Sequence, residues 1–406
     1  MKRRNAAFVV GVVTLLILSF FLGIESFLPP KNKAEGQAKF YVGVECGYNN
    51  VTLCKALIDK IKDYTNLVII GSTDIIKNAS LLNDVCDYAY NKGMYISVYF
   101  SPFQNYTALS QNATLPSQSS LPIGWLRNAT SKYGDRFIGA YVFDEPGGNQ
   151  LDGMALKNKT ISETDYQNLT NYYVGNVSSK IQPYQNIGVL TFTSDYGLYW
   201  FDYKAGYYAV FAELGGNNGS RQLPISLCRG AATSQGKEWG VMITTRFYDG
   251  RILESGLELY DDLVLGYNSG AKFAVVFDYA LAVSASGQEM VPYQPQKYGI
   301  LQDDHFEALK NFWTYTHENL DKQGSVVADV ALVVPENLGF GFRNAEDTVW
   351  GGNGDTLSHA VWDNVYKYIN QYRDRVDIVY NDPEFAGSIK THYAKVIEIP
   401  NDTTKP

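Results

Sequence analysis

Apolar runs of seven to ten residues recur along the chain from residue 39, and a loop and an amphipathic stretch follow most of them. The first four runs are KFYVGVEC (39–46), NLVIIGS (66–72), MYISVYF (94–100) and RFIGAYVFDE (136–145). The next four are IGVLTFTS (187–194), YYAVFAE (207–213), WGVMITTRF (239–247) and KFAVVFDY (272–279). Nearly continuous apolar strands that alternate with helical patterns predict a parallel sheet covered on both faces.

Eight such units match a (β/α)₈ TIM barrel in number and size, and we place this domain at residues 38–323. The helical pattern at 302–322 would complete the eighth unit. A doubly wound open sheet is the alternative, but it usually has fewer strands and a Gly-rich phosphate turn. No G-x-G-x-x-G follows the first run, which favours the barrel.

The pattern after residue 323 predicts a second, smaller unit. Strand-like runs lie at 327–335, 376–385 and 393–400, and a helical pattern lies at 358–372. We therefore expect a small C-terminal α/β domain at 324–406, of the βαβ type that is part of a flavodoxin-like fold.

The N-terminus carries an export signal. The basic stretch MKRR precedes an uncharged run of nineteen residues, 6–24, which is long enough to cross a bilayer as a helix. We interpret 1–28 as a signal anchor and 29–37 as a linker; a cleaved signal peptide is the alternative. Either interpretation places the body on the extracellular face of the membrane or in the medium.

Further features agree with export. Ten N-x-S/T sequons predict a glycoprotein, at Asn50, Asn78, Asn105, Asn112, Asn128, Asn158, Asn168, Asn176, Asn218 and Asn401. Of the four cysteines, Cys54 and Cys86 fall on the first two predicted helices, so we expect either a disulfide between them or buried free thiols. The net charge is −8, so the chain lacks the excess of basic residues that nucleic-acid binding requires.

Polar side chains end the predicted barrel strands, where the active sites of such barrels lie. The residues at or just beyond these ends are Glu45, Asp74, Tyr99, Asp144, Glu145, Asp195, Glu213, Arg246, Asp249, Asp278 and Tyr279. None of the four histidines lies there, so we expect no metal and no cofactor. Glycoside hydrolases use a pair of carboxyl groups across a cleft. When carboxyl groups lie close together, the pKa of one of them rises, which gives a protonated acid beside an ionised base.

The motif FDEP (143–146) resembles the Asn-Glu-Pro ending of strand 4 in many retaining (β/α)₈ glycosidases. By that resemblance Glu145 is the acid/base, and Asp144 takes the place of the sugar-contacting Asn. The C-terminal segment resembles the flavodoxin-like domain of family-42-type β-galactosidases. The whole chain resembles exported archaeal proteins of glycosidase-like barrel type, with VWGG (349–352) and DIVYNDPEF (377–385) in the tail.

The chain departs from that family at strand 7, which reads MITTRF where the large retaining clan carries its nucleophile Glu. Glu213 on strand 6 is the nearest replacement, so we predict Glu145 and Glu213 as the catalytic pair, with Asp144 and Asp278 as further candidates. The predicted substrate-binding residues are Glu45, Tyr99, Asp195, Trp200, Arg246 and Tyr279. Each has a structural alternative, above all a salt bridge from Glu213 to Arg246.

Two functions follow from this pattern. The first is an exported hydrolase of extracellular polysaccharide or glycan, with a glycosyltransferase as a variant of the same cleft. The second is a barrel without catalysis that binds glycans at the cell envelope. Carboxyl oxygens of the pair at roughly 5–5.5 Å would indicate a retaining enzyme and about 6.5–9.5 Å an inverting one.

Overall fold

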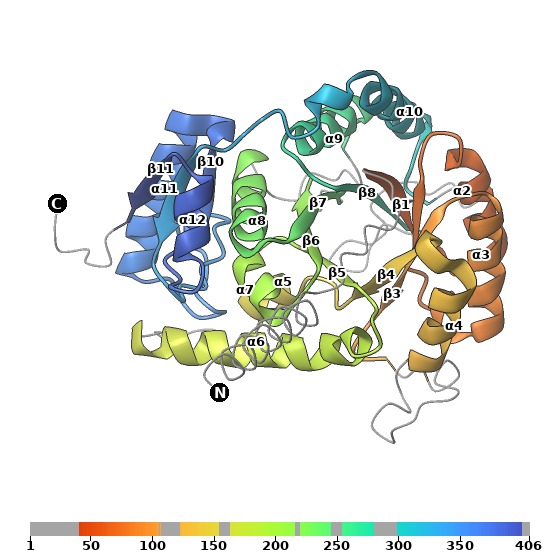
Figure 1. Ribbon diagram of the computed structural model, residues 1–406, viewed down its shortest axis with the longest axis horizontal. Coiled ribbons are helices and arrows are strands. Elements are labelled where there is room, and N and C mark those ends of the chain that lie inside the picture. Colours follow the sequence, from red (N-terminus) through yellow and green to blue (C-terminus); the bar gives the residue numbers. More distant parts are fainter. Residues whose placement is uncertain are drawn as a thin grey trace, which may run out of the picture. The chain divides into compact units, whose positions relative to one another are not determined.

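Eight parallel strands pair in chain order and close into a barrel in the computed structural model (Figure 1). The structure describes residues 40–104, 106, 122–153, 163–215, 220–244, 254–279 and 299–399. The strands are β1 Tyr41–Gly47, β2 Leu67–Ile70, β3 Tyr95–Phe100, β4 Phe137–Val142, β5 Thr191–Asp195, β6 Ala209–Leu214, β7 Glu238–Ile243 and β8 Phe273–Tyr279. Because β8 also pairs with β1, the predicted barrel is confirmed and the open sheet is wrong.

Aromatic rings fill the part of the barrel near the amino ends of the strands. The Phe273 ring, at the start of β8, lies 4.9 Å from the Tyr41 ring and 5.3 Å from the Phe211 ring. Gly240 on β7 makes this packing possible, because a Cβ there would lie 2.7 Å from atoms of both Phe211 and Phe273. The polar strand ends therefore lie at the opposite mouth.

Helices surround the barrel and connect its strands (Figure 1). They are α2 Val51–Ile61, α3 Ala79–Asn91, α4 Ile123–Tyr133, α5 Pro146–Asp152, α6 Glu163–Gln185, α7 Tyr199–Ala205, α8 Gln222–Gln235, α9 Gly256–Asn268 and α10 Asp303–Glu318. Short 3₁₀ helices occupy Ile75–Lys77, Gly134–Arg136, Leu320–Lys322 and Arg373–Arg375. Two sequon asparagines, Asn50 and Asn78, cap the N-termini of α2 and α3 through their side-chain oxygens.

A second sheet follows the barrel. Its strands β9 Val330–Val334, β10 Val376–Tyr380 and β11 Lys395–Glu398 run parallel in the order β10-β9-β11, and α11 Thr356–Tyr372 and α12 Ala386–His392 connect them. Strand β10 packs on α8, where Arg229 Nε lies 2.8 Å from Asp377 Oδ1 in a buried salt bridge. The small α/β unit is thus present, and the boundary at residue 323 stays a prediction.

The export prediction concerns residues that the structure does not describe. The run 6–24 lies outside the described residues, as do the sequons at Asn105, Asn112, Asn158, Asn218 and Asn401. Within the described part of the chain, no helix is long and apolar enough to cross a membrane.

The structure has Cys54 and Cys86 as buried free thiols, the second of the two alternatives. All four cysteines are free and buried, and the sulfur of Cys54 faces Cys46 at the end of β1. The helices α2 and α3 are neighbours, as expected, but the side chain of Cys54 points toward the barrel wall.

Candidate active site

The FDEP segment leaves β4 through a strained turn. Phe143 and Glu145 both adopt left-handed backbone conformations, with φ of 61° and 50°. Such a conformation costs a non-glycine residue roughly 1–3 kcal/mol and persists only where the surroundings impose it. Strand β5 imposes it, because the Thr193 hydroxyl donates to the Phe143 carbonyl (2.6 Å) and the Glu145 N–H donates to the Ser194 carbonyl (3.1 Å).

Asp195 fixes the next part of this turn. Its carboxyl accepts hydrogen bonds from the N–H groups of Gly147 (2.5 Å), Gly148 (2.9 Å), Tyr196 (2.8 Å) and Gly197 (3.1 Å). Gly148 is required, since a Cβ there would overlap the Tyr196 ring. Asp195 is 0% exposed and its carboxyl binds the backbone of the turn that follows Glu145, in place of the predicted contact with substrate.

The structure brings Glu145 and Glu213 together at the mouth of the barrel. The Glu145 carboxyl is within hydrogen-bonding distance of the Glu213 carboxyl. From β5, the Ser194 hydroxyl donates to Glu213 Oε1 at 2.6 Å and lies 2.7 Å from the Tyr141 hydroxyl, which also binds Asp144. Ser194 therefore links the deeper carboxyl of the pair to the end of β4.

Burial controls the protonation of this pair. It raises the pKa of Glu145 to about 8, and the charges of Asp144 and Asp195 add to the rise. Burial is also the main cause that raises the pKa of Glu213 well above its ordinary value, and the charges of Glu145 and Asp144 raise it further. The hydrogen bond from Ser194 lowers it. We expected the Asp144 charge to keep Glu145 protonated, but desolvation is the larger cause. Burial opposes ionisation of both carboxyls, and because the hydrogen bond with Glu213 lowers the pKa of Glu145, Glu145 is the one whose ionised form the contact favours.

The carboxyls differ in their access to water. Asp144 is exposed and Glu145 half-buried, whereas Glu213 is 8% and Glu45 5% exposed. Burial and the Asp144 charge raise the pKa of Glu45 well above its ordinary value. Half-buried Tyr99 lies beside this cluster, with its ring 5.4 Å from the ring of Tyr141, and burial followed by the Asp144 charge raises its pKa. Asp144 and Glu145 are therefore the carboxyls of this cluster that a substrate reaches first.

Asp278 has a structural role in place of the predicted catalytic one. It is 0% exposed and accepts hydrogen bonds from the N–H groups of Ile300 (2.8 Å) and Leu301 (3.2 Å) and from the Tyr48 hydroxyl. Burial raises its pKa to about 7. Its carboxyl fastens the segment before α10 to the end of β8, and these hydrogen bonds occupy it.

The prediction for Trp200 is also wrong. Trp200 lies on helix α7 and is 2% exposed. Its ring packs 5.4 Å from the Tyr380 ring and 5.6 Å from the Phe385 ring of the C-terminal unit. The predicted contacts of Arg246 and of the Tyr279 side chain lie outside the described residues.

Sequence reasoning missed Thr193, Ser194 and Tyr141, which hold the catalytic candidates in place. A signal was present, because Thr193 and Ser194 directly precede Asp195 at the end of the fifth apolar run. At the end of β7, Thr244 follows Ile243, so the described part of strand 7 has no carboxylate at the mouth. Among the described residues, no cluster of three or more His, Cys, Asp or Glu side chains has the arrangement of a metal site.

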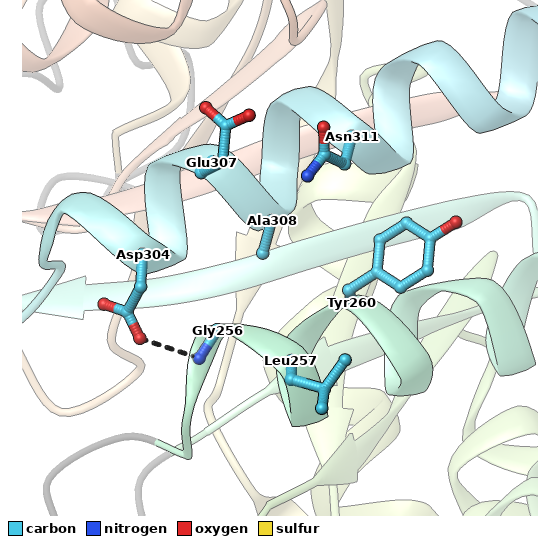
Figure 2. Close-up of a pocket in the computed structure, with 7 residues that line it drawn as sticks. All are labelled: Gly256, Leu257, Tyr260, Asp304, Glu307, Ala308 and Asn311. Carbon is cyan, nitrogen blue, oxygen red and sulfur yellow. Dashed lines mark hydrogen bonds between the residues drawn. The ribbon is translucent and has the colours of Figure 1, made fainter.

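A separate pocket of about 460 Å³ lies on the outer ring of helices, between α9 and α10 (Figure 2). Asp304 on its wall accepts a hydrogen bond from the Gly256 N–H (2.9 Å), which secures the start of α9. Glu307 and Asn311 of α10 and Tyr260 of α9 complete much of the wall (Figure 2). None of the lining residues belongs to the carboxyl cluster, so this pocket is not the candidate active site.

Comparisons with known proteins agree on the fold. No protein-family model matches the chain, and no curated protein matches its sequence. Among solved structures, an alanine variant of GH5_18 from Streptomyces cattleya in complex with Manβ1-4GlcNAc superposes with a TM-score of 0.54 at 11% identity, over 88% of this chain and 98% of that one. A GH5_18 from Bifidobacterium longum subsp. infantis gives a TM-score of 0.52 at 11% identity, over 89% and 97%. The structural neighbours are thus glycoside hydrolase barrels, and at this identity they show the fold alone.

Proposed function

We propose that this chain is a glycoside hydrolase that cleaves O-glycosidic bonds, with Glu145 as the proton donor. The observation that carries the proposal is the position of half-buried Glu145 within hydrogen-bonding distance of Glu213 at the carboxyl ends of the barrel strands, where burial raises the pKa of Glu145 to about 8. A general acid must hold its proton at the working pH, and burial supplies that here. The fold that it shares with glycoside hydrolases supports the same interpretation.

Glu213 then acts as nucleophile or as the base that activates water, which requires its ionised form; because burial raises its pKa, the reaction needs a pH at which this carboxyl has lost its proton. The two carboxyls lie within hydrogen-bonding distance of each other, which is closer than the roughly 5–5.5 Å of retaining or 6.5–9.5 Å of inverting enzymes. A glycosidic oxygen must therefore enter between them. The Ser194 hydroxyl anchors the Glu213 carboxyl, whereas the Glu145 carboxyl is bound to Glu213, so we assign the movement to the Glu145 side chain.

The solvent exposure of the carboxyls decides which of them can contact a substrate. Asp144 takes the position of a sugar-contacting residue, and Tyr99 and Glu45 line the deeper wall. The Streptomyces cattleya neighbours were crystallised with Manβ1-4GlcNAc and GlcNAc, so a β-linked mannosyl-GlcNAc glycan is the first substrate class to test. We further propose that the run 6–24 exports the protein, that the barrel at 38–323 carries the reaction, and that the flavodoxin-like unit at 324–406 supports it.

A glycan-binding protein without catalysis is the second candidate. The closed contact between Glu145 and Glu213 and the absence of a carboxylate at the described end of β7 both favour it. In that case the carboxyls and Tyr99 bind sugar hydroxyls, and no bond is cleaved.

The test measures release of reducing sugar from Manβ1-4GlcNAc and a panel of β-linked polysaccharides. The Glu145→Gln and Glu213→Gln variants are compared with Glu307→Gln, whose side chain is 60% exposed on the outer ring. We expect activity in the wild type and in the Glu307 variant and its loss in the other two. Sugar binding without release by the wild type would favour the second candidate.

A further inference from the structure

Two buried cysteines face each other beside the candidate active site. Cys46 lies near the end of β1 and Cys54 in the first turns of α2, and both are 0% exposed. Their sulfur atoms are 2.6 Å apart. A disulfide holds its sulfurs about 2.05 Å apart, so a shift of roughly half an ångström closes the bond. We propose that Cys46 and Cys54 form a disulfide in the mature protein.

The other two cysteines have different surroundings. Cys228 on α8 lies 3.5 Å from the Val210 carbonyl and 3.9 Å from the Tyr203 hydroxyl. Cys86 is buried in α3, and burial raises the pKa of its thiol. The proposal therefore gives one bridge and two free thiols. A bridge from Cys54 to Cys86 would exclude it, since Cys54 can pair only once.

The reaction is a two-electron oxidation. The two thiols lose two protons and two electrons, and one sulfur–sulfur bond forms. The disulfide of an exported thiol oxidoreductase takes up both protons and both electrons and becomes a dithiol, or dioxygen takes them up and becomes hydrogen peroxide. Because both sulfurs are inaccessible in the folded barrel, the bond forms before folding is complete. The inference rests on the export part of the proposed function, where oxidising conditions preserve disulfides, and not on the hydrolase activity.

The bridge would secure the loop that follows β1. This loop contains Tyr48, whose carbonyl lies 3.5 Å from Cys54 Sγ and whose hydroxyl donates to Asp278. Cys46 also directly follows Glu45, one of the four clustered carboxyls. Closing residues 46–54 into a covalent ring thus fixes the β1 side of the candidate active site.

Alkylation under denaturing conditions tests the proposal. The full chain, exported by its host, is denatured without reductant, treated with iodoacetamide and weighed by mass spectrometry. We expect two alkylated cysteines in the wild type, three in Cys54→Ser, and one in the matched control Cys86→Ser. Peptide mapping should join Cys46 to Cys54. Four alkylated cysteines, or a Cys54–Cys86 peptide, would overturn the proposal.

If the bridge is not found, the cause could be that the chain is not exported or that a variant misfolds. A second measurement distinguishes these causes from a true absence of the bridge. Wild-type protein made under reducing conditions is refolded in oxidised and reduced glutathione. We expect the Cys46–Cys54 bridge to form, and protein refolded with tris(2-carboxyethyl)phosphine present throughout to melt several degrees lower than the bridged protein. Refolded protein that keeps four free thiols contradicts the bridge, whether or not the chain is exported and whether or not it hydrolyses a glycan.

Discussion

Replacing Asp278 by asparagine should change the pH dependence of stability and leave the fold intact. The amide oxygen can accept the N–H groups of Ile300 and Leu301 as the carboxylate oxygen does, and the amide nitrogen can donate to the Tyr48 hydroxyl. The substitution therefore removes a titrating group while keeping size and hydrogen bonds. It also tests whether Asp278 is structural, as its burial indicates, or catalytic.

The magnitude follows from the raised pKa of this carboxyl. Burial moves the pKa from 3.8 to about 7. Between these values the folded protein binds a proton that the unfolded chain has released, so the free energy of unfolding falls as the pH rises from 4 to 7 and is level above that. At 1.36 kcal/mol for each tenfold change in proton binding, the loss is on the order of 4 kcal/mol.

Urea unfolding followed by circular dichroism at pH 4, 5.5, 7 and 8 measures this effect. Between pH 4 and 7 the free energy of unfolding should fall in the wild type by on the order of 4 kcal/mol more than it falls in Asp278→Asn. Asp321→Asn, at a side chain that is 79% exposed, is the control and should follow the wild type. Parallel curves for the wild type and Asp278→Asn would refute the reasoning, and loss of hydrolysis in Asp278→Asn would return this residue to the catalytic candidates.

Two further substitutions test how β5 holds the FDEP turn. In Gly148→Ala the new methyl group overlaps the Tyr196 ring, so we expect the free energy of unfolding to fall by about 1–3 kcal/mol and hydrolysis to be reduced. The control is Gly175→Ala, where a Cβ meets no atom within 4 Å, and this variant should unfold at or above the wild-type temperature. In Ser194→Ala the hydrogen bond that lowers the pKa of Glu213 is lost, so that pKa rises and the pH–rate profile should move to higher pH; an unmoved profile would mean that Glu213 does not ionise in the reaction.

The fold could be predicted from the sequence because the strands are nearly continuous apolar runs. The run RFIGAYVFDE predicts β4 and its polar end, and the structure places the Glu145 carboxyl within hydrogen-bonding distance of the Glu213 carboxyl. Their catalytic pairing stays a prediction. Each of the eight strand–helix units can be recognised from its own stretch of sequence, because apolar strands and amphipathic helices alternate regularly. The strand boundaries differ by a few residues, since polar residues such as Arg136 and Lys272 directly precede strands without belonging to them.

The roles of the other strand-end carboxyls could not be predicted in this way. Asp195 and Asp278 resemble Glu145 in sequence, but each is saturated by backbone N–H groups of a neighbouring loop. Only the path of those loops decides whether a carboxyl faces substrate or backbone. Trp200 looked exposed because the C-terminal unit that covers it begins well over a hundred residues later in the chain.

The most direct test of Glu145 as proton donor compares two leaving groups. A sugar leaving group needs protonation, whereas 2,4-dinitrophenolate departs without it. In Glu145→Gln, kcat/KM for Manβ1-4GlcNAc, or for the substrate that the panel identifies, should fall by about 10²–10⁴-fold, while kcat/KM for the matching dinitrophenyl glycoside stays near the wild-type value. Equal losses on both substrates, or no loss on either, would contradict the assignment of Glu145 as the acid.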